Sequence, residues 1–361
     1  MKIGLIIYGS LDTVSGGYLY DRQLVRYLRE AGEQVEIISL PWTAYGRHLL
    51  HNFSSPLKQR LCDTSFDVLL QDELNHPSLF LLNRQLNGRY PIISIVHHLR
   101  CSEARPAWQN RLYRQVERRY LASVDGFVFN SETTRRVTED VLGERELAIA
   151  KQQRPFVVAT PAANHHNQFI THAQIQQRAL ANGPLRLLFV GNLISRKGLH
   201  VLLQALASLP AADYQLTIVG STETDPEYTQ KIEQQLVGIP NVALLGSLSD
   251  AQLAKQFANH HVLVVPSSYE GFGIVYLEGM GFGLTAVGTT AGAAGEIITH
   301  GRNGFLIEPD DVASLAAHLQ TLQQNRDKLA EMSVAAREHF LTQPTWGDSI
   351  GRIHRFLQQM S

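Results

Sequence analysis

The chain has 361 residues, which is longer than a single hydrophobic core usually grows, so we expect two domains. Apolar residues make up 44% of the chain and charged residues 18%, a composition that excludes disordered and fibrous proteins. The formal net charge of −1 provides no overall field that would attract nucleic acid, so no nucleic-acid partner is expected.

The cysteines and the first residues point to a reducing compartment. Cys62 and Cys101 form no CxxC pair, so neither a disulfide framework nor a structural zinc site is predicted. The opening residues MKIGLIIYGS hold an apolar run of strand length, shorter than that of a signal peptide. No run of 18 apolar residues occurs. We therefore expect a cytoplasmic protein.

Short β-rich apolar runs alternate with amphipathic helical stretches, which is typical of parallel sheets with helical crossovers. The first helix is expected at Tyr18–Ala31, before Gly32. The strands expected in the first half are Lys2–Tyr8, Val35–Ser39, Val68–Gln71, Ile92–His97, Gly126–Asn130 and Phe156–Thr160. The strands expected in the second half are Arg186–Val190, Gln215–Val219, Val242–Leu245, Val262–Pro266, Thr285–Gly288 and Gly304–Ile307. The helices expected there are Leu199–Ser208, Pro226–Leu236, Asp250–Ala258, Ile274–Phe282 and Val312–Gln324.

Two α/β domains in tandem follow from this pattern, with an N-terminal domain at 1–165 and a C-terminal domain at 185–345. Residues 166–184 show little hydrophobic periodicity and are interpreted as a linker. A last helix, at about 346–361, follows a break at Pro344. The pattern alone does not choose its partner, and we predict that it packs back on the first domain.

The turn after the first strand of the second half carries charge suited to phosphate. Gly191 follows the strand, and Arg196 and Lys197 precede the next helix. Strand ends in open parallel sheets face the ligand site, and a guanidinium can bridge two phosphate oxygens. An ordinary turn with two solvated cations remains an alternative, and neither the GxGxxG nor the GxxxxGK[ST] pattern is present there.

A second loop, PSSYEGFG at 266–273, also lies between a strand and a helix. Its glycines allow close approach of the backbone to a ligand, and the N–H groups at the helix start can donate to phosphate or hydroxyl groups. Glu278 follows Glu270 by eight residues. If the helix starts near Ile274, Glu278 lies just over one turn inside it, roughly 6 Å along the helix axis. The two carboxylates should therefore meet different parts of one extended ligand, although an acid and nucleophile pair of a glycosidase, or two solvated glutamates, are not excluded by spacing.

These residues resemble glycosyltransferase family 4. The resemblance rests on the run PSSYEGFGIVYLEGMGFG, on AGAAGE at 291–296, on NGFLIEPD at 303–310 and on the Arg-Lys-Gly turn at 196–198. It covers essentially the whole second half in the right order. The family implies a retaining enzyme of the GT-B fold, in which two Rossmann-like parallel-sheet domains face each other across a cleft.

The resemblance also implies roles for individual residues. Glu270 would contact hydroxyls of the transferred sugar, and Glu278 would hold the nucleotide ribose. Arg196 and Lys197 would neutralise the leaving diphosphate, which is the main catalytic effect. The donor-binding residues implied around them are Gly191, Phe272, Gly273 and Ile274.

The first half resembles the family less closely. Gly16 and Gly17 stand in a glycine-rich loop before the first helix, where the family backbone approaches donor phosphate and acceptor. His97 matches the family histidine near the reacting carbon, and a histidine satisfied within the core is the alternative. GT-B enzymes generally need no metal, so we expect neither a metal ion nor a cofactor.

Six arginines make the segment near 105–121 basic. Two readings stay open: peripheral contact with the inner face of an anionic membrane, or a solvated surface helix whose Trp108, Leu112, Tyr113 and Val116 form an inward stripe. The arginines are Arg100, Arg105, Arg111, Arg114, Arg118 and Arg119.

The activity expected is transfer of a hexose to a hydroxyl of a saccharide, a lipid-linked acceptor or a small molecule. A UDP-sugar is the first guess for the donor and GDP-mannose the second. A non-catalytic nucleotide-sugar binding protein of the same fold, or a nucleotide-sugar epimerase, remains an alternative.

Overall fold

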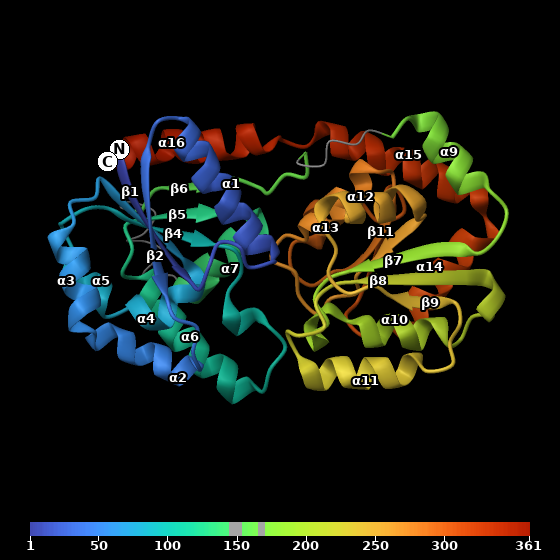
Figure 1. Cartoon of the computed structure of the whole chain (residues 1–361), viewed down its shortest axis with the longest axis horizontal. Helices are drawn as coiled ribbons and strands as arrows, with labels where there is room; N and C mark the ends of the chain where they lie inside the picture. The colour runs from blue at the N-terminus through green and yellow to red at the C-terminus, as the bar shows by residue number, and fades with distance from the viewer. Residues whose placement is uncertain (144–153, 165–169) are drawn as a thin grey trace. The chain divides into compact units, whose positions relative to one another are not determined.

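The computed structural model describes residues 1–143, 154–164 and 170–361. The chain forms two compact units (Figure 1). Unit 1 comprises Met1–Pro161 together with Trp346–Ser361, and unit 2 comprises Ala162–Thr345.

Unit 1 is built on a six-stranded parallel sheet in the order β2-β1-β3-β4-β5-β6. Its strands are β1 (Lys2–Tyr8), β2 (Gln34–Leu40), β3 (Val68–Asp72), β4 (Ile92–Val96), β5 (Gly126–Phe129) and β6 (Phe156–Val158). Its α-helices are α1 (Gly16–Glu30), α2 (Tyr45–His48), α3 (Ser55–Asp63), α4 (His76–Leu79), α5 (Leu82–Leu86), α6 (Ala107–Leu121), α7 (Glu132–Leu142) and α16 (Trp346–Met360). Short 3-10 helices lie at η1 (Leu49–Phe53), η2 (Glu73–Asn75) and η3 (Arg100–Ser102).

The central strands β3 and β4 are buried along their whole length. Helices cover both faces of a parallel sheet, so its inner strands are apolar at nearly every position. The exceptions, Gln71, Asp72 and Ser94, are polar residues with very little solvent exposure.

Unit 2 repeats the architecture with a second parallel sheet, ordered β12-β11-β10-β7-β8-β9. Its strands are β7 (Leu185–Val190), β8 (Tyr214–Val219), β9 (Val242–Leu244), β10 (Val262–Val264), β11 (Thr285–Thr289) and β12 (Gly304–Ile307). Its α-helices are α9 (His172–Leu180), α10 (Leu199–Leu206), α11 (Pro226–Leu236), α12 (Asp250–Asn259), α13 (Ile274–Gly281), α14 (Val312–Gln324) and α15 (Arg326–Thr342). Short 3-10 helices lie at η4 (Ser195–Lys197), η5 (Ala211–Asp213) and η6 (Ala294–Glu296).

The predicted α/β class with two parallel sheets is confirmed, and each of the twelve predicted strands ends within two residues of the observed one. The agreement follows from the strands themselves, because apolar runs of this length, closed by glycine or proline, have few other stable conformations.

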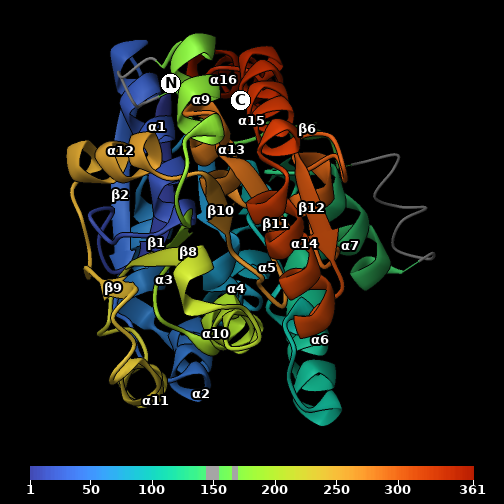
Figure 2. The ribbon, with the colours of Figure 1, turned by 90° about the vertical axis from the view of Figure 1, so that its right-hand side faces the viewer.

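The interpretation of 166–184 as a linker is wrong for the part that the structure describes, and residues 166–169 lie outside the described residues. Helix α9 occupies 172–180 and opens with a reciprocal capping box between Thr171 and Gln174. Its Ile175 is fully buried, and its Arg178 donates hydrogen bonds to the carbonyls of Phe282 and Gly283. Helix α9 thus belongs to unit 2, where it packs along α15, as both views show (Figures 1 and 2).

Helix α16 belongs to unit 1, although 184 residues of unit 2 separate it in sequence from the rest of that unit. It packs against α1 and β6 and buries Trp346, Ile350 and Ile353. His354 forms an ion pair with Glu33 at 2.7 Å. In the described part of the chain, no helix is long and apolar enough to cross a membrane.

Candidate functional site

Two loops of unit 2 that follow neighbouring strands meet at the carboxyl edge of its sheet. Strands β7 and β10 pair directly, and the loop after β7 carries Arg196 and Lys197 while the loop after β10 carries Glu270. Because parallel strands end at the same edge, these loops are neighbours despite 73 residues of separation. Such an edge is where open α/β sheets bind ligands.

The structure brings the predicted Arg196, Lys197 and Glu270 into contact. Lys197 Nζ lies 2.5 Å from Glu270 Oε1, and Arg196 Nη1 lies 4.0 Å from Glu270 Oε2. Ser267 donates a hydrogen bond of 2.6 Å to the same Oε1, and Arg196 donates one of 2.7 Å to the carbonyl of Tyr269. The sequence does not indicate the role of Ser267, because one of two adjacent serines in a loop gives no distinguishing signal.

Glu270 is a buried anion. Burial alone would raise the pKa of Glu270, but the charges of Lys197 and Arg196, with hydrogen bonds from Lys197 and Ser267, lower this pKa to about 2. An ionised carboxylate accepts hydrogen bonds only. The side chain is therefore suited to hydroxyl groups of a ligand, with two cations beside it that can meet an anion.

One glycine allows the two loops to approach each other. It is not Gly191, where an added Cβ would lie at an ordinary contact distance of 3.4 Å from Cδ of Lys197 in the same loop. Gly198 has φ +72°, and a Cβ there would lie 2.0 Å from the carbonyl oxygen of Pro266. No other residue fits at position 198, so the contact between the loops depends on this glycine.

Helix α13 opens directly after the Glu270 loop. Gly273 precedes Ile274 in a left-handed conformation with φ +89°, and the neighbouring Phe272 is buried. The first N–H groups of a helix have no partner inside it and carry a partial positive charge, so they are available to a ligand. Glu278 lies in the second turn of α13 and is also buried.

Unit 1 brings together the predicted Gly17 and His97. Helix α1 begins at Gly16, and the side chain of Ser15 caps it by accepting a hydrogen bond from the Tyr18 N–H. A Cβ at Gly17 would lie 3.3 Å from Cδ2 of His97. The glycine therefore places backbone directly against the histidine ring.

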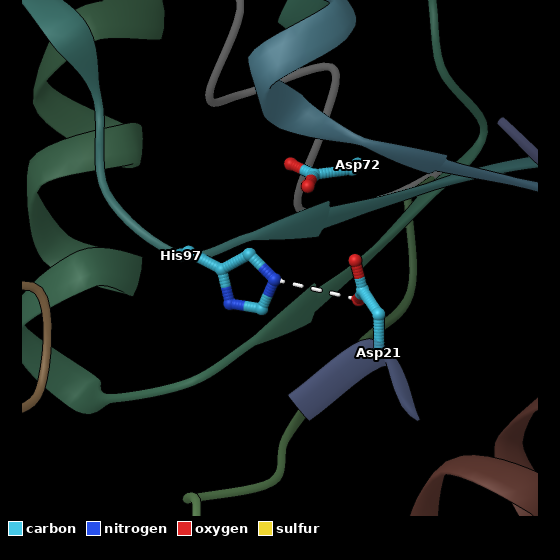
Figure 3. Close-up of side chains that lie close together, drawn as sticks. All are labelled: Asp21, Asp72 and His97. Atoms are coloured by element: carbon cyan, nitrogen blue, oxygen red, sulfur yellow. Dashed lines mark ion pairs between the residues drawn. The ribbon is translucent and has the colours of Figure 1, made fainter. Parts of the chain in front are cut away.

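His97 directly follows β4, and two buried carboxylates lie near it (Figure 3). Its Nε2 is 3.5 Å from Oδ1 of Asp21 on α1, and Asp72 ends the neighbouring strand β3. Sequence reasoning missed both carboxylates. Asp72 carried a signal, since it immediately follows an expected strand, whereas Asp21 lies within a helical pattern that gives no hint of its contact.

The predicted inward stripe of Trp108, Leu112, Tyr113 and Val116 is wrong for two of its residues in helix α6. Trp108 and Leu112 are 63% and 59% exposed, so they do not face the core, whereas Tyr113 and Val116 are half-buried. Tyr113 instead packs against Tyr45, and the Arg100 guanidinium lies over both rings. The outer face of α6 combines exposed apolar and basic side chains.

Among the described residues of unit 1, two groups of buried side chains have ligand atoms close enough to share a cation. One is Asp21, Asp72 and His97, and the other is Glu73, His76 and Glu117; in each group these atoms lie within 4.8 Å of one another. In the second group two members already have partners. The Tyr45 hydroxyl lies 2.9 Å from Nε2 of His76, and Glu117 accepts hydrogen bonds from the N–H groups of Arg100 and Cys101. The expectation that the protein needs no metal stays a prediction.

The two sheets and their connections define a GT-B protein. Sucrose-phosphate synthase of Thermosynechococcus elongatus matches with a TM-score of 0.80 at 20% identity, over 99% of this chain and 98% of that chain. HepE of Anabaena, solved with UDP and glucose, matches with a TM-score of 0.74 at 20% identity, over 99% of each chain.

Residues 171–339 match the family model described as glycosyl transferases group 1. The matched residues lie within unit 2, and the resemblance of the chain to glycosyltransferase family 4 is consistent with the match. Sulfoquinovosyl transferase SQD2 of Arabidopsis thaliana is 34% identical over 166 residues, which are 44% of this chain and 31% of that protein. The chain spans 31% to 60% of the length of the first three curated relatives that it matches.

Proposed function

We propose that this chain is a retaining glycosyltransferase that moves a hexose from a nucleoside diphosphate sugar to a hydroxyl of a saccharide, lipid-linked or small-molecule acceptor. The observation that carries the proposal is the contact of Lys197 and Arg196 with Glu270 at the ends of two neighbouring strands. A sugar diphosphate presents hydroxyls beside a dianion. The arrangement in unit 2 offers a carboxylate that accepts hydrogen bonds beside two cations, which is the complementary set of groups.

In the proposed reaction the acceptor hydroxyl attacks the anomeric carbon from the face that the diphosphate leaves. The bond between that carbon and the phosphate oxygen breaks, and its electron pair stays on the diphosphate. The hydroxyl proton passes to a phosphate oxygen, which leaves a glycoside and a nucleoside diphosphate. Arg196 and Lys197 stabilise the charge that develops on the leaving group, and no metal ion is needed.

The remaining residues hold the donor. Glu270 takes hydroxyls of the sugar and Glu278 those of the ribose. Backbone groups at Gly191 and at the start of α13 (Phe272, Gly273 and Ile274) approach the sugar and phosphates. In unit 1, Gly16 and Gly17 give the backbone access to phosphate or acceptor, and His97 helps to place the donor sugar.

A UDP-sugar is the first choice of donor, and GDP-mannose is the second. The HepE structure, solved with UDP and glucose, supports the first choice because it has the same fold. A thermal-shift screen of UDP, GDP and ADP sugars tests this order, since a ligand at 100 times its Kd adds about 2.7 kcal/mol to stability.

Glu270→Gln and Lys197→Met test the site directly. Each variant should abolish both the thermal shift with the donor and the formation of a glycoside, which is followed by mass spectrometry with a pool of acceptors. Glu227→Gln is the matched control, because Glu227 pairs with Lys231 on the exposed face of α11. EDTA should leave the transfer rate unchanged.

The thermal-shift screen and an analysis of the reaction products together separate the alternatives. A binding protein would shift with donor but release no nucleoside diphosphate, and an epimerase would isomerise the sugar without releasing it. If no nucleotide sugar shifted the melting temperature and none were hydrolysed, the proposed function would be wrong.

We also propose that α6 contacts the inner face of an anionic membrane. Trp108, Arg111, Leu112, Gln115 and Arg119 are exposed, and their spacing of three and four residues places them on one side of the helix. Apolar side chains flanked by arginines suit an interface that is both apolar and negatively charged.

Co-sedimentation with vesicles of phosphatidylcholine, with and without phosphatidylglycerol, tests this contact. The wild-type chain should bind the anionic vesicles, and Trp108→Ser with Leu112→Ser should reduce binding at unchanged melting temperature. Val237→Ser, at an apolar residue of unit 2 that is 82% exposed, is the control. Equal binding of both vesicle types would contradict the proposed charge dependence.

A further inference from the structure

Three side chains from different elements of unit 1 converge at the carboxyl edge of its sheet. Asp21 comes from α1, Asp72 ends β3 and His97 follows β4, and β3 pairs with both β1 and β4. All three are at least nine-tenths buried, and their ligand atoms lie within 4.8 Å of one another. Figure 3 shows the carboxylates of Asp21 and Asp72 near the imidazole ring of His97, with the ion pair to Asp21 as a dashed line.

Asp21 is the unusual member of this group. It is fully buried, and neither of its oxygens has a hydrogen-bond partner among the described residues. A buried carboxylate without hydrogen bonds is strongly unfavourable unless a positive charge or a proton compensates it. The Nε2 of His97, at 3.5 Å, is the ion-pair partner that the structure provides.

The charged groups that face His97 from the elements packed around it favour the protonated, positively charged form of its imidazole. Burial would lower the pKa of His97, but the Asp21 carboxylate, with Asp72 and Glu73, raises this pKa above its usual value. The uncharged neighbours provide an aromatic edge from Tyr20 at 5.2 Å and hydrogen bonds from Asn130 and Thr134 to the His97 carbonyl. The backbone of Gly17 also lies against the ring, since a Cβ there would be 3.3 Å from Cδ2 and 3.6 Å from Nε2.

We propose that Asp21 and Asp72 form a carboxylate cradle that fixes the His97 ring, with Nε2 turned to Asp21 and Nδ1 left for the substrate. Asp21 is then a positioning residue that acts through His97. The proposal rests on the proposed function in assigning His97 to the donor sugar. The geometry of the cradle itself is independent of that assignment.

The cradle determines what His97 can do. A histidine that is protonated on both nitrogens donates hydrogen bonds and cannot take a proton. In the protonated form of His97, Nδ1–H binds an oxygen of the donor, and the proton of the acceptor hydroxyl goes elsewhere, as in the proposed transfer to the leaving phosphate. Burial and the charge of Asp21 raise the pKa of Asp72 to about 7, so Asp72 changes the charge of the cradle near neutral pH.

The first experiment measures the cradle without any substrate. NMR titration of the full chain with labelled histidine gives the pKa of His97, assigned by its loss in His97→Gln. Asp21→Asn should lower this pKa by about 1 to 3 units, the usual effect of removing a carboxylate at this distance. Glu103→Gln, which removes the carboxylate 2.9 Å from the neighbouring His98, should leave it unchanged. An unchanged pKa in Asp21→Asn would overturn the cradle.

The second experiment measures transfer. Asp21→Asn should lower kcat by about tenfold or more with little change in donor KM, because a carboxylate that holds a histidine controls its ring orientation and protonation. The double variant Asp21→Asn/His97→Gln should be no slower than His97→Gln alone, and circular dichroism shows whether each variant is folded. Additive losses in the double variant would contradict a role through His97.

The two experiments distinguish failure of the carboxylate cradle from failure of the proposed function. If the pKa of His97 falls as expected but no variant or wild-type chain transfers a sugar, the cradle stands and the proposed function is wrong. If Mn²⁺ broadens the His97 signals at micromolar concentration in the wild-type chain and not in Asp21→Asn, the cluster is a cation site and the cradle is overturned.

Discussion

For Glu270, the sequence predicts contact with a ligand but not the contact with Lys197. Its place in a glycine-rich loop between strand and helix predicts that it meets a ligand. Its direct contact with Lys197 depends on which strands are neighbours, and local pattern does not specify the pairing of β7 with β10. The consequence is a carboxylate with a strongly lowered pKa.

This lowered pKa predicts a specific loss of stability in acid. The pKa of Glu270 is about 2 in the folded chain and about 4.3 in an unfolded chain, so its stabilisation is complete above about pH 5. The stabilisation, roughly 3 kcal/mol in full, is lost as the pH falls from about 4.3 to 2. Between pH 6 and pH 3.5 the wild-type chain should therefore lose about 1 kcal/mol more than Glu270→Gln.

Urea unfolding of both chains at several pH values, followed by circular dichroism, measures this difference. Glu227→Gln serves as the control, because its ion pair is exposed and should contribute little. Parallel pH profiles for the wild-type chain and Glu270→Gln would show that Lys197 and Arg196 do not hold the charge of Glu270 in the folded state.

The loop between β7 and α10 depends on a single backbone position. Gly198 adopts φ +72°, and a side chain there would strike the Pro266 carbonyl of the neighbouring loop. Gly198→Ala should destabilise unit 2 by more than the roughly 1 to 2 kcal/mol of a positive φ alone, and should separate Lys197 from Glu270. Chemical unfolding and the thermal shift with donor measure the two effects.

Gly238→Ala is the matched control for this clash. Gly238 also lies in unit 2 and has φ +79°, but a Cβ there would have no neighbour within 4 Å. This variant should show only the cost of its backbone conformation and keep its response to the donor. Equal losses at positions 198 and 238 would show that contact with Pro266 contributes nothing.

The sequence indicates the buried parallel strands directly, because each strand is an apolar run that can be recognised without knowledge of its partners. Helix α9 is different, since five of its nine residues are His, Gln or Arg and only a narrow apolar edge is buried. Its conformation depends on partners distant in sequence, namely α15 and the carbonyls at positions 282 and 283. The same limit applies to the candidate site. Asp21 on α1 and His97 after β4 come together because of the order of the strands in the sheet, which local sequence does not specify.

Helix α9 should behave as part of unit 2 and not as a connecting segment. Ile175→Ala removes a fully buried side chain that packs under Gly283, so it should cost about 2 to 4 kcal/mol. Gln177→Ala, at an exposed position of the same helix, should be nearly neutral. Urea unfolding of both variants measures the difference, and two neutral substitutions would favour the linker interpretation.

The path of the chain leaves unit 1 after Pro161 and returns at Trp346, so unit 1 is complete only with the last helix. Helix α16 buries Trp346, Ile350, Ile353 and Leu357, and Glu33 near the end of α1 binds both His354 and the N-terminal ammonium. Burying side chains of this kind stabilises by about 1.5 to 3 kcal/mol each, which is a large share of the stability of one domain.

Removal of residues 345–361 should therefore weaken unit 1 and spare unit 2. Hydrogen exchange followed by mass spectrometry should show lost protection in β1, α1 and β6, while β7, β10 and α13 keep theirs. The thermal shift with a nucleotide sugar should persist if unit 2 holds the donor contacts proposed for Arg196, Lys197 and Glu270. Arg355→Ala, an exposed change on the same helix, provides a full-length control. Equal loss of protection in both sheets would mean that unit 2 depends on α16 for its own stability, and the division into two independently packed units would then be wrong.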